Sequence, residues 1–192
     1  MTDADDDELA QAVEAIASNL NIGLHEAVHI VIWRATGEGI GEVIDQEDRV
    51  ITTLSPARSL DEWDVIALMA PEVYMTMHGI PFTDNSVSDD RRVIDLILRD
   101  KPDADAIKAK TAEELRFVLS CPHIERAIGI LAPELDDIET IGSVSGEVIH
   151  QFIDPVLMPS KYAVGLRELL KDQLDAEPEK ETTREDLDHS AP

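Results

Sequence analysis

Residues 24–35, LHEAVHIVIWRA, join two histidines four positions apart to an almost unbroken apolar run. On an α-helix, residues i and i+4 point about 40° apart, so His25 and His29 can reach the same metal ion. Glu26 is turned about 100° from His25, where it can take a proton from metal-activated water without being a ligand. The apolar residues recur at helical spacing. The stretch therefore predicts a buried helix, over about residues 22–36, that carries two metal ligands.

Acidic residues dominate the composition. The 192 residues include 41 Asp and Glu but only 16 Lys and Arg, which gives a formal net charge of −25. Binding to nucleic acid or to an anionic membrane needs clusters of basic residues, so we expect neither as a partner. With 43% hydrophobic residues, the chain can bury one core. We expect one domain over residues 9–174, between an acidic cap at 1–8 and a disordered acidic tail at 175–192.

Three features of the sequence favour a cytoplasmic location. Cys121 is the single cysteine, so no internal disulfide can form. Residues 1–8 are acidic and lack the basic and apolar regions of a signal peptide. No apolar run approaches the roughly 20 residues that a membrane-spanning helix needs. We therefore expect a soluble cytoplasmic protein, with no prediction of its oligomeric state.

Helical patterns predominate in the rest of the chain. Apolar runs on either side of Asp45-Gln46-Glu47-Asp48 predict a β-hairpin with a four-residue loop, the one clear strand signal. Capping boxes, prolines and apolar spacing predict helices at about residues 9–20, 59–79, 88–101, 103 or 111 to 120, 124–138, 145–155 and 161–174. The expected fold is mainly α (α+β): a helical bundle with the HExxH helix in its core and one small hairpin.

A catalytic zinc ion takes three protein ligands and keeps a fourth position for water, so another element must supply the third ligand. A carboxylate held in the first turn of a helix is well positioned and rigid, which favours Asp89 or Asp90 after Ser88. The helix dipole alone also favours acidic residues in a first helical turn, so their position there does not decide whether Asp89 or Asp90 is the ligand. The full set of candidates is Glu62, Asp64, Glu72, His78, Asp84, Asp89 and Asp90.

The order of motifs over about residues 20–150 resembles the zinc peptidase domain of the FtsH-type ATP-dependent proteases. HEAVH at residues 25–29 matches the family's HEAGH helix, and Ala67-Leu68-Met69-Ala70-Pro71 is similar to its Leu-Ala-Gly-Pro-Ala-Ala-Glu helix. Residues 137–147, DIETIGSVSGE, resemble its closing Glu-Thr-Leu and Gly-Glu motifs. In that family, an Asp that opens a later helix is the third ligand, and Asp90 falls at the matching place.

The resemblance implies a zincin-like fold in which His25, His29 and Asp90 hold Zn²⁺ and Glu26 is the general base. We expect a stand-alone zinc metalloendopeptidase that cleaves peptides or unfolded protein segments. The sequence has no GxxxxGK[ST] loop, so this cleavage is expected to be independent of ATP. Tyr74 or His78 can help to stabilise the oxyanion.

Three alternatives stay open. The third ligand can be Asp89 or Glu72 instead of Asp90. The chain can be a non-catalytic interaction or regulatory domain that keeps the peptidase fold, with or without bound zinc. The motif can also have arisen by chance in an acidic helical protein.

Overall fold

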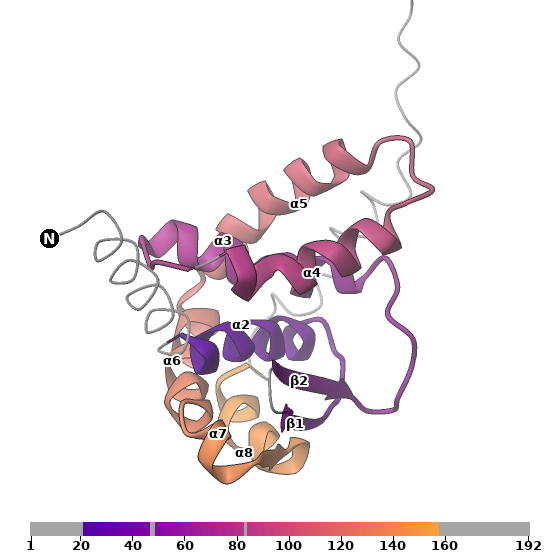
Figure 1. The fold of residues 1–192 in the computed structure, drawn as a ribbon. Helices are drawn as coiled ribbons and strands as arrows, with labels where there is room; N and C mark the ends of the chain where they lie inside the picture. The colour runs from indigo at the N-terminus through magenta and orange to yellow at the C-terminus, as the bar shows by residue number, and fades with distance from the viewer. Residues whose placement is uncertain (1–20, 47–48, 83, 158–192) are drawn as a thin grey trace, which may run out of the picture.

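The computed structural model describes residues 21–46, 49–82 and 84–157. This part of the chain is mainly helical, as expected, with seven helices and a small antiparallel sheet (Figure 1). The helices expected at 9–20 and 161–174 and the two acidic ends lie outside the described residues. Within the described ranges, no helix has the length and apolarity needed to cross a lipid bilayer.

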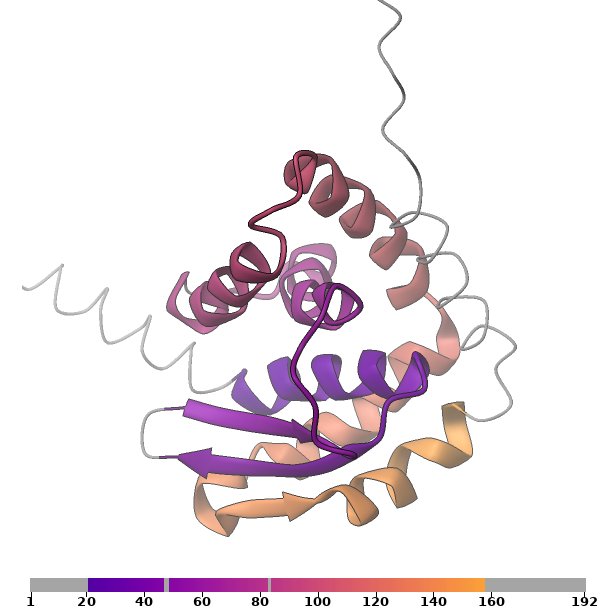
Figure 2. The ribbon, with the colours of Figure 1, turned by 90° about the vertical axis from the view of Figure 1, so that its right-hand side faces the viewer.

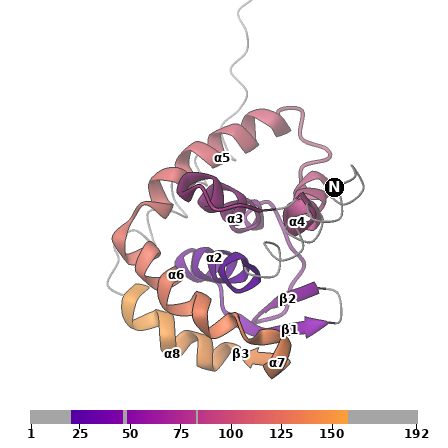
Figure 3. The same ribbon diagram turned by 60° about the vertical axis from the view of Figure 1, so that its left-hand side comes forward.

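Helix α2 (Ile22–Ala35) is the predicted HExxH helix, and it lies in the middle of the molecule. Ten of its 14 residues are buried, both histidines among them. A helix that is apolar around its whole circumference has to be enclosed by other elements. Figure 3 shows the enclosure: α3 (Asp64–His78) lies above α2, and α6 (Pro122–Leu135) lies beside and below it. The expected helix and its burial are confirmed.

The sheet contains one strand more than the sequence indicated. Strand β1 (Ile40–Gln46) pairs antiparallel with β2 (Arg49–Leu54), which confirms the hairpin. The pairing of the two strands extends to Gln46 and Arg49, so only residues 47–48 connect them. The predicted four-residue loop was therefore wrong. Strand β3 (Ser143–Ser145) pairs with the other edge of β1, and α2 covers one face of the hairpin (Figure 2). The short Ser-Val-Ser sequence of β3 does not itself predict a strand. Its extended conformation depends on the pairing with β1.

Helix α3 begins later than the predicted capping box at residues 59–62. Two side-chain bonds hold the preceding turn outside the helix: Trp63 N donates to Asp61 Oδ1 at 2.9 Å, and Asp61 N donates to Asp64 Oδ2 at 2.7 Å. Such local bonds compete with helix formation. The helix ends at Gly79 as predicted, because this glycine adopts a left-handed conformation with φ of 63°.

Helix α4 (Asp84–Ile97) begins a turn before the predicted start at Ser88. Val87 is 1% exposed and lies on the same buried side as Ile94 and Leu98. This apolar stripe extends the amphipathic pattern towards the N-terminus, so the helix includes residues 84–86 as well. Asp90 consequently lies in the second turn of α4 rather than in its first.

The remaining helices complete a stack around α2. In Figure 3, α5, α3, α2 and the pair of α6 and α8 follow one another from top to bottom. Helix α5 begins at the earlier of its two predicted starts, and α6 ends before Ile138, which opens a separate short helix instead. The bounds are Ala104–Leu119 for α5, Ile138–Ile141 for α7 and Gly146–Leu157 for α8.

Two glycines provide a test of the packing between α8 and β1. A Cβ on Gly146 would overlap the backbone carbonyl of Ile40, whereas a Cβ on the exposed helical Gly129 meets no atom within 4 Å. We expect Gly146→Ala to lower the free energy of unfolding by about 1–3 kcal/mol, because backbone must move. Gly129→Ala should raise it by about 0.5–1 kcal/mol. Urea denaturation measures both, and equal stabilities of the two variants would contradict this packing.

Candidate metal centre

Three side chains from two helices meet at one point. His25 and His29 come from α2, and Asp90 comes from α4. The Nε2 atoms of the two histidines are 3.0 Å apart. Asp90 Oδ2 lies 3.1 Å from His25 Nε2 and 3.2 Å from His29 Nε2. The structure therefore brings together the three residues that the sequence and the family resemblance proposed as ligands.

The spacing of these three atoms fits one face of a tetrahedron around zinc. Ligand atoms at about 2.0–2.1 Å from a tetrahedral zinc ion lie about 3.3 Å from one another. The observed separations of 3.0–3.2 Å are close to this value. Nitrogen and oxygen lone pairs that converge in this way repel one another unless a proton or a cation lies between them. Two imidazoles and one carboxylate are also a donor set that suits zinc.

The ring of His29 is oriented by helix α3. Its Nδ1 atom lies 2.8 Å from the backbone carbonyl of Ala67. A carbonyl can only accept, so Nδ1 carries the hydrogen, and Nε2 of the neutral ring has its lone pair free. A backbone carbonyl is one of the usual partners of a metal-binding histidine. The acceptor on α3 is a backbone carbonyl, so this bond was not predictable from the sequence.

His25 is held in a different way. Its Nδ1 atom is buried and has no hydrogen-bond partner among the described residues. The ring makes an edge contact with His29, with ring centroids 4.7 Å apart and an interplanar angle of 76°. His25 thus lacks the orienting hydrogen bond that His29 receives.

Burial and charge act in opposite directions on the pKa values of the cluster. Burial disfavours the charged form of His29, but the carboxylates of Asp90 and Glu26 and the hydrogen bonds of the ring raise its pKa to about 9. Burial also favours a protonated Asp90, yet the two histidines hold the pKa of this carboxyl well below its usual range. Without a metal, the pair is therefore an imidazolium and a carboxylate, and a metal ion has to displace the proton of His29.

Glu26 lies on α2 near the cluster without being part of it. Its carboxylate accepts a hydrogen bond of 2.8 Å from Thr52 Oγ1 on β2. Its negative charge contributes to the raised pKa of His29, whereas the three converging ligand atoms belong to other residues. A nearby carboxylate outside the ligand set is what the role of general base requires. The bond to Thr52 had no signal in the sequence.

The other candidate ligands have different surroundings. Glu62 is paired with Lys101 at 2.8 Å, and the Glu72 carboxylate is paired with Arg91. Asp89 is exposed, and the side chain of Asp84 is outside the described part of the structure. Among the described residues, Asp90 alone of these candidates joins the two histidines.

The two residues expected near the oxyanion lie against each other. The rings of Tyr74 and His78 have centroids 4.3 Å apart. Burial and the nearby Glu125 of α6 raise the pKa of Tyr74. No hydrogen bond between either ring and the three cluster residues is found among the described residues. An oxyanion role for Tyr74 or His78 stays a prediction.

Asp64 supports the cluster indirectly, through Trp33, and this contact was not predicted from the sequence. The ring of Trp33 stacks on His29, with centroids 5.4 Å apart and planes 26° apart. Trp33 Nε1 donates to Asp64 Oδ1 at 2.9 Å. Asp64 is 1% exposed, and it accepts further bonds from the Arg58 guanidinium at 2.7 and 2.9 Å and from Asp61 N. This buried carboxylate is fully hydrogen-bonded and fixes the indole against His29.

Comparisons of the chain with protein-family models, with curated proteins and with solved structures give no match. The resemblance to the FtsH-type peptidase domain stays a prediction. A function for the chain therefore has to be inferred from the chemistry of the metal centre.

The network around Asp64 predicts unequal effects of two neighbouring substitutions. We expect Asp64→Asn to lower the free energy of unfolding by about 3 kcal/mol, because a buried ion pair with Arg58 is broken. Asp61→Asn should cost less than about 1 kcal/mol, since the Asp61 side chain is 55% exposed and 3.7 Å from Arg58. Urea denaturation followed by tryptophan fluorescence measures both. Similar losses in the two variants would show that Asp64 has no special role.

Proposed function

We propose that this protein is a zinc-dependent metallopeptidase of zincin-like fold. In this proposal His25, His29 and Asp90 hold Zn²⁺, and Glu26 is the general base. The observation that supports it is the convergence of two Nε2 atoms and one carboxylate oxygen within 3.0–3.2 Å, beside the glutamate of an HExxH helix. Each part has the chemistry that metal-assisted hydrolysis of an amide requires.

The residues of the chain divide the work of hydrolysis. His25, His29 and Asp90 would hold Zn²⁺, which would supply a Lewis acid able to lower the pKa of water to about 7. Glu26 takes a proton from the attacking water and passes it to the leaving amine, so that the peptide C–N bond breaks to give an acid and an amine. Ala67 and Trp33 keep the His29 ring in position during these steps.

The burial of the centre favours flexible substrates. His25 is 8% exposed and His29 is 3% exposed, so the surface of a folded protein is too broad to reach them. An extended peptide backbone is much narrower than the surface of a folded protein. We therefore assign peptides and unfolded protein segments as the substrate class.

The metal content of the purified protein tests the ligand set. We expect about one zinc ion per chain in the wild type after reconstitution and dialysis, and almost none in His29→Ala or Asp90→Ala, because each variant loses a ligand. Asp89→Ala is the matched control, since it removes the adjacent exposed carboxylate and should keep zinc. Elemental analysis by mass spectrometry measures these contents. A wild type without zinc, or an Asp90→Ala variant that keeps it, would refute the ligand set.

Removal of the general base tests the activity separately. We expect Glu26→Gln to retain zinc but to cleave quenched fluorescent peptides at least about 100-fold more slowly, because no carboxylate takes the proton. The control is Glu139→Gln, which changes an exposed glutamate of α7 and should leave cleavage unchanged. A wild type that binds zinc but cleaves no peptide would instead support the non-catalytic alternative.

A further inference from the structure

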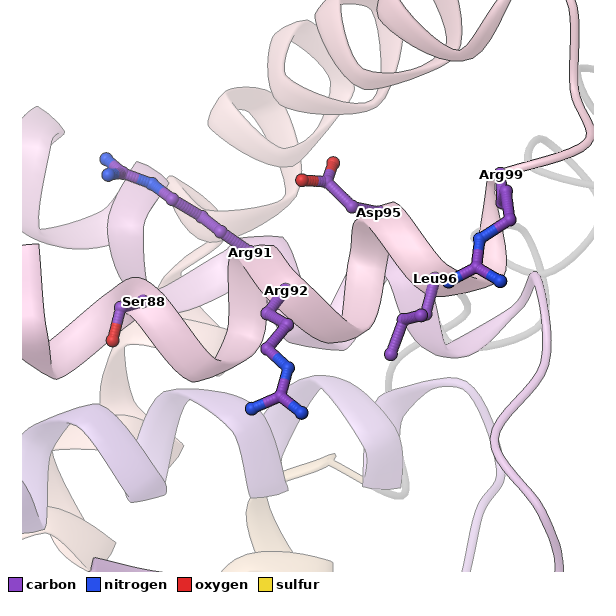
Figure 4. A pocket seen from close by; sticks show the side chains of 6 residues that line it. All are labelled: Ser88, Arg91, Arg92, Asp95, Leu96 and Arg99. Carbon is purple, nitrogen blue, oxygen red and sulfur yellow. The ribbon is translucent and has the colours of Figure 1, made fainter.

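The outer side of α4 has a surface hollow away from the metal centre, which we call the α4 hollow. It is lined by residues of α4 and by Arg99 in the turn that follows this helix, and three of these residues are arginines in a chain that has few basic residues. Figure 4 shows the lining side chains, which are Ser88, Arg91, Arg92, Asp95, Leu96 and Arg99.

Two of the charges at the hollow are already neutralised. Arg91 forms hydrogen bonds of 3.0 and 2.8 Å with the carboxylate of Glu72 on α3. Asp95 is paired at 2.5 Å with Lys108 on α5. These pairs connect α4 to α3 and α5. Because Asp95 is paired with Lys108, its negative charge only partly compensates the arginines of the hollow.

Arg92 and Arg99 are different. Both are exposed, and neither has an ion pair or a side-chain hydrogen bond with any residue that the structure describes. The chain has 41 acidic residues, but no carboxylate of the described residues is paired with Arg92 or Arg99. Two positive charges are therefore available to a ligand at this surface.

An apolar side chain lies between the two charges. Leu96 is 49% exposed. Arg92 is four residues before it, so these two side chains lie on one side of α4. Arg99 follows Leu96 by three residues, in the turn after the helix. Figure 4 shows Arg92 and Leu96 on the same side of α4 and the Arg99 guanidinium turned back towards Leu96. The surface thus offers a positive, an apolar and a positive group in a row.

We propose that the α4 hollow binds an extended acidic segment of a partner protein, with an apolar residue between two carboxylates. The seven residues from Arg92 to Arg99, in the turn that follows α4, correspond to about 10.5 Å at the helical rise of about 1.5 Å per residue. In an extended segment, residues i and i+4 lie about 13 Å apart on one face, with residue i+2 between them. The long arginine side chains span the difference, so a Glu-x-Leu-x-Glu segment places its carboxylates on the arginines and its leucine on Leu96.

The charge of the whole chain favours such a peptide over nucleic acid. A net charge of −25 repels a long phosphate backbone, and nucleic acid has no aliphatic group for Leu96. The surface is also separate from the metal centre, since Arg92 and Leu96 point about 160° and 120° around the helix from Asp90. The inference is therefore independent of whether the protein is a peptidase.

Peptide binding to the full-length protein tests this inference. The probe is a fluorescein-labelled peptide, Gly-Glu-Ser-Leu-Ser-Glu-Gly, followed by fluorescence anisotropy at low salt. We expect saturable binding that weakens as salt rises, and about tenfold weaker binding to Arg92→Ala/Arg99→Ala, because two exposed charge pairs are lost. Leu96→Ser should also weaken binding. Arg116→Ala/Arg126→Ala is the matched control, since it removes two exposed arginines of α5 and α6.

Several outcomes would overturn the inference. They are no saturable binding to the wild type, equal binding of a peptide with Gln in place of both Glu residues, and unchanged affinity of the Arg92→Ala/Arg99→Ala variant. Tighter binding of a single-stranded oligonucleotide with the same charge would assign the surface to nucleic acid instead. The substituted side chains are exposed and unpaired, so thermal melting should show that each variant stays folded.

Discussion

The burial of α2 on all its sides is the constraint on which the rest of the structure depends. A helix with most of its residues buried has to place most of its polar groups against partners inside the protein. His29 bonds to a carbonyl of α3, Trp33 bonds to Asp64, and Arg34 forms two hydrogen bonds, of 2.6 and 2.8 Å, with Asp154 of α8. Each bond connects α2 to another element and fixes a side chain at the same time. The packing that stabilises the fold therefore also orients the candidate metal centre.

Local features of the sequence were predictable, and features that depend on distant contacts were not. The HExxH helix follows from residue spacing alone, as does the mainly helical fold. The choice between Asp89 and Asp90 depends on which side of α4 is buried. The apolar stripe of Val87 and Ile94 contains that information, because Asp90 is three residues after the first and four before the second. Strand β3 and the carbonyl of Ala67 were not predictable, because backbone groups acquire their partners only in the tertiary structure.

Carboxylates in the interior of the protein and carboxylates on its surface are stabilised in different ways. Two carboxylates close to α2 face cationic or polar donors: the buried Asp64 faces Arg58, and the partly buried Asp90 faces the histidines. A buried charge without such a partner is costly. On the surface, water and salt screen the remaining carboxylates, so they need no partner there. Water and salt screen the charges of Arg92 on α4 and of Arg99 in the following turn in the same way.

The two helices that supply the cluster are far apart in sequence, since Asp90 follows His29 by 61 residues. A metal ion held by both would close a loop of this length, as a covalent cross-link does. Closing a loop of about 60 residues removes conformational entropy from the unfolded chain that corresponds to about 4 kcal/mol. With Cys121 as its single cysteine, the chain has no disulfide that could serve this purpose. Removal of such a metal ion would therefore loosen the whole domain and not the candidate metal centre alone.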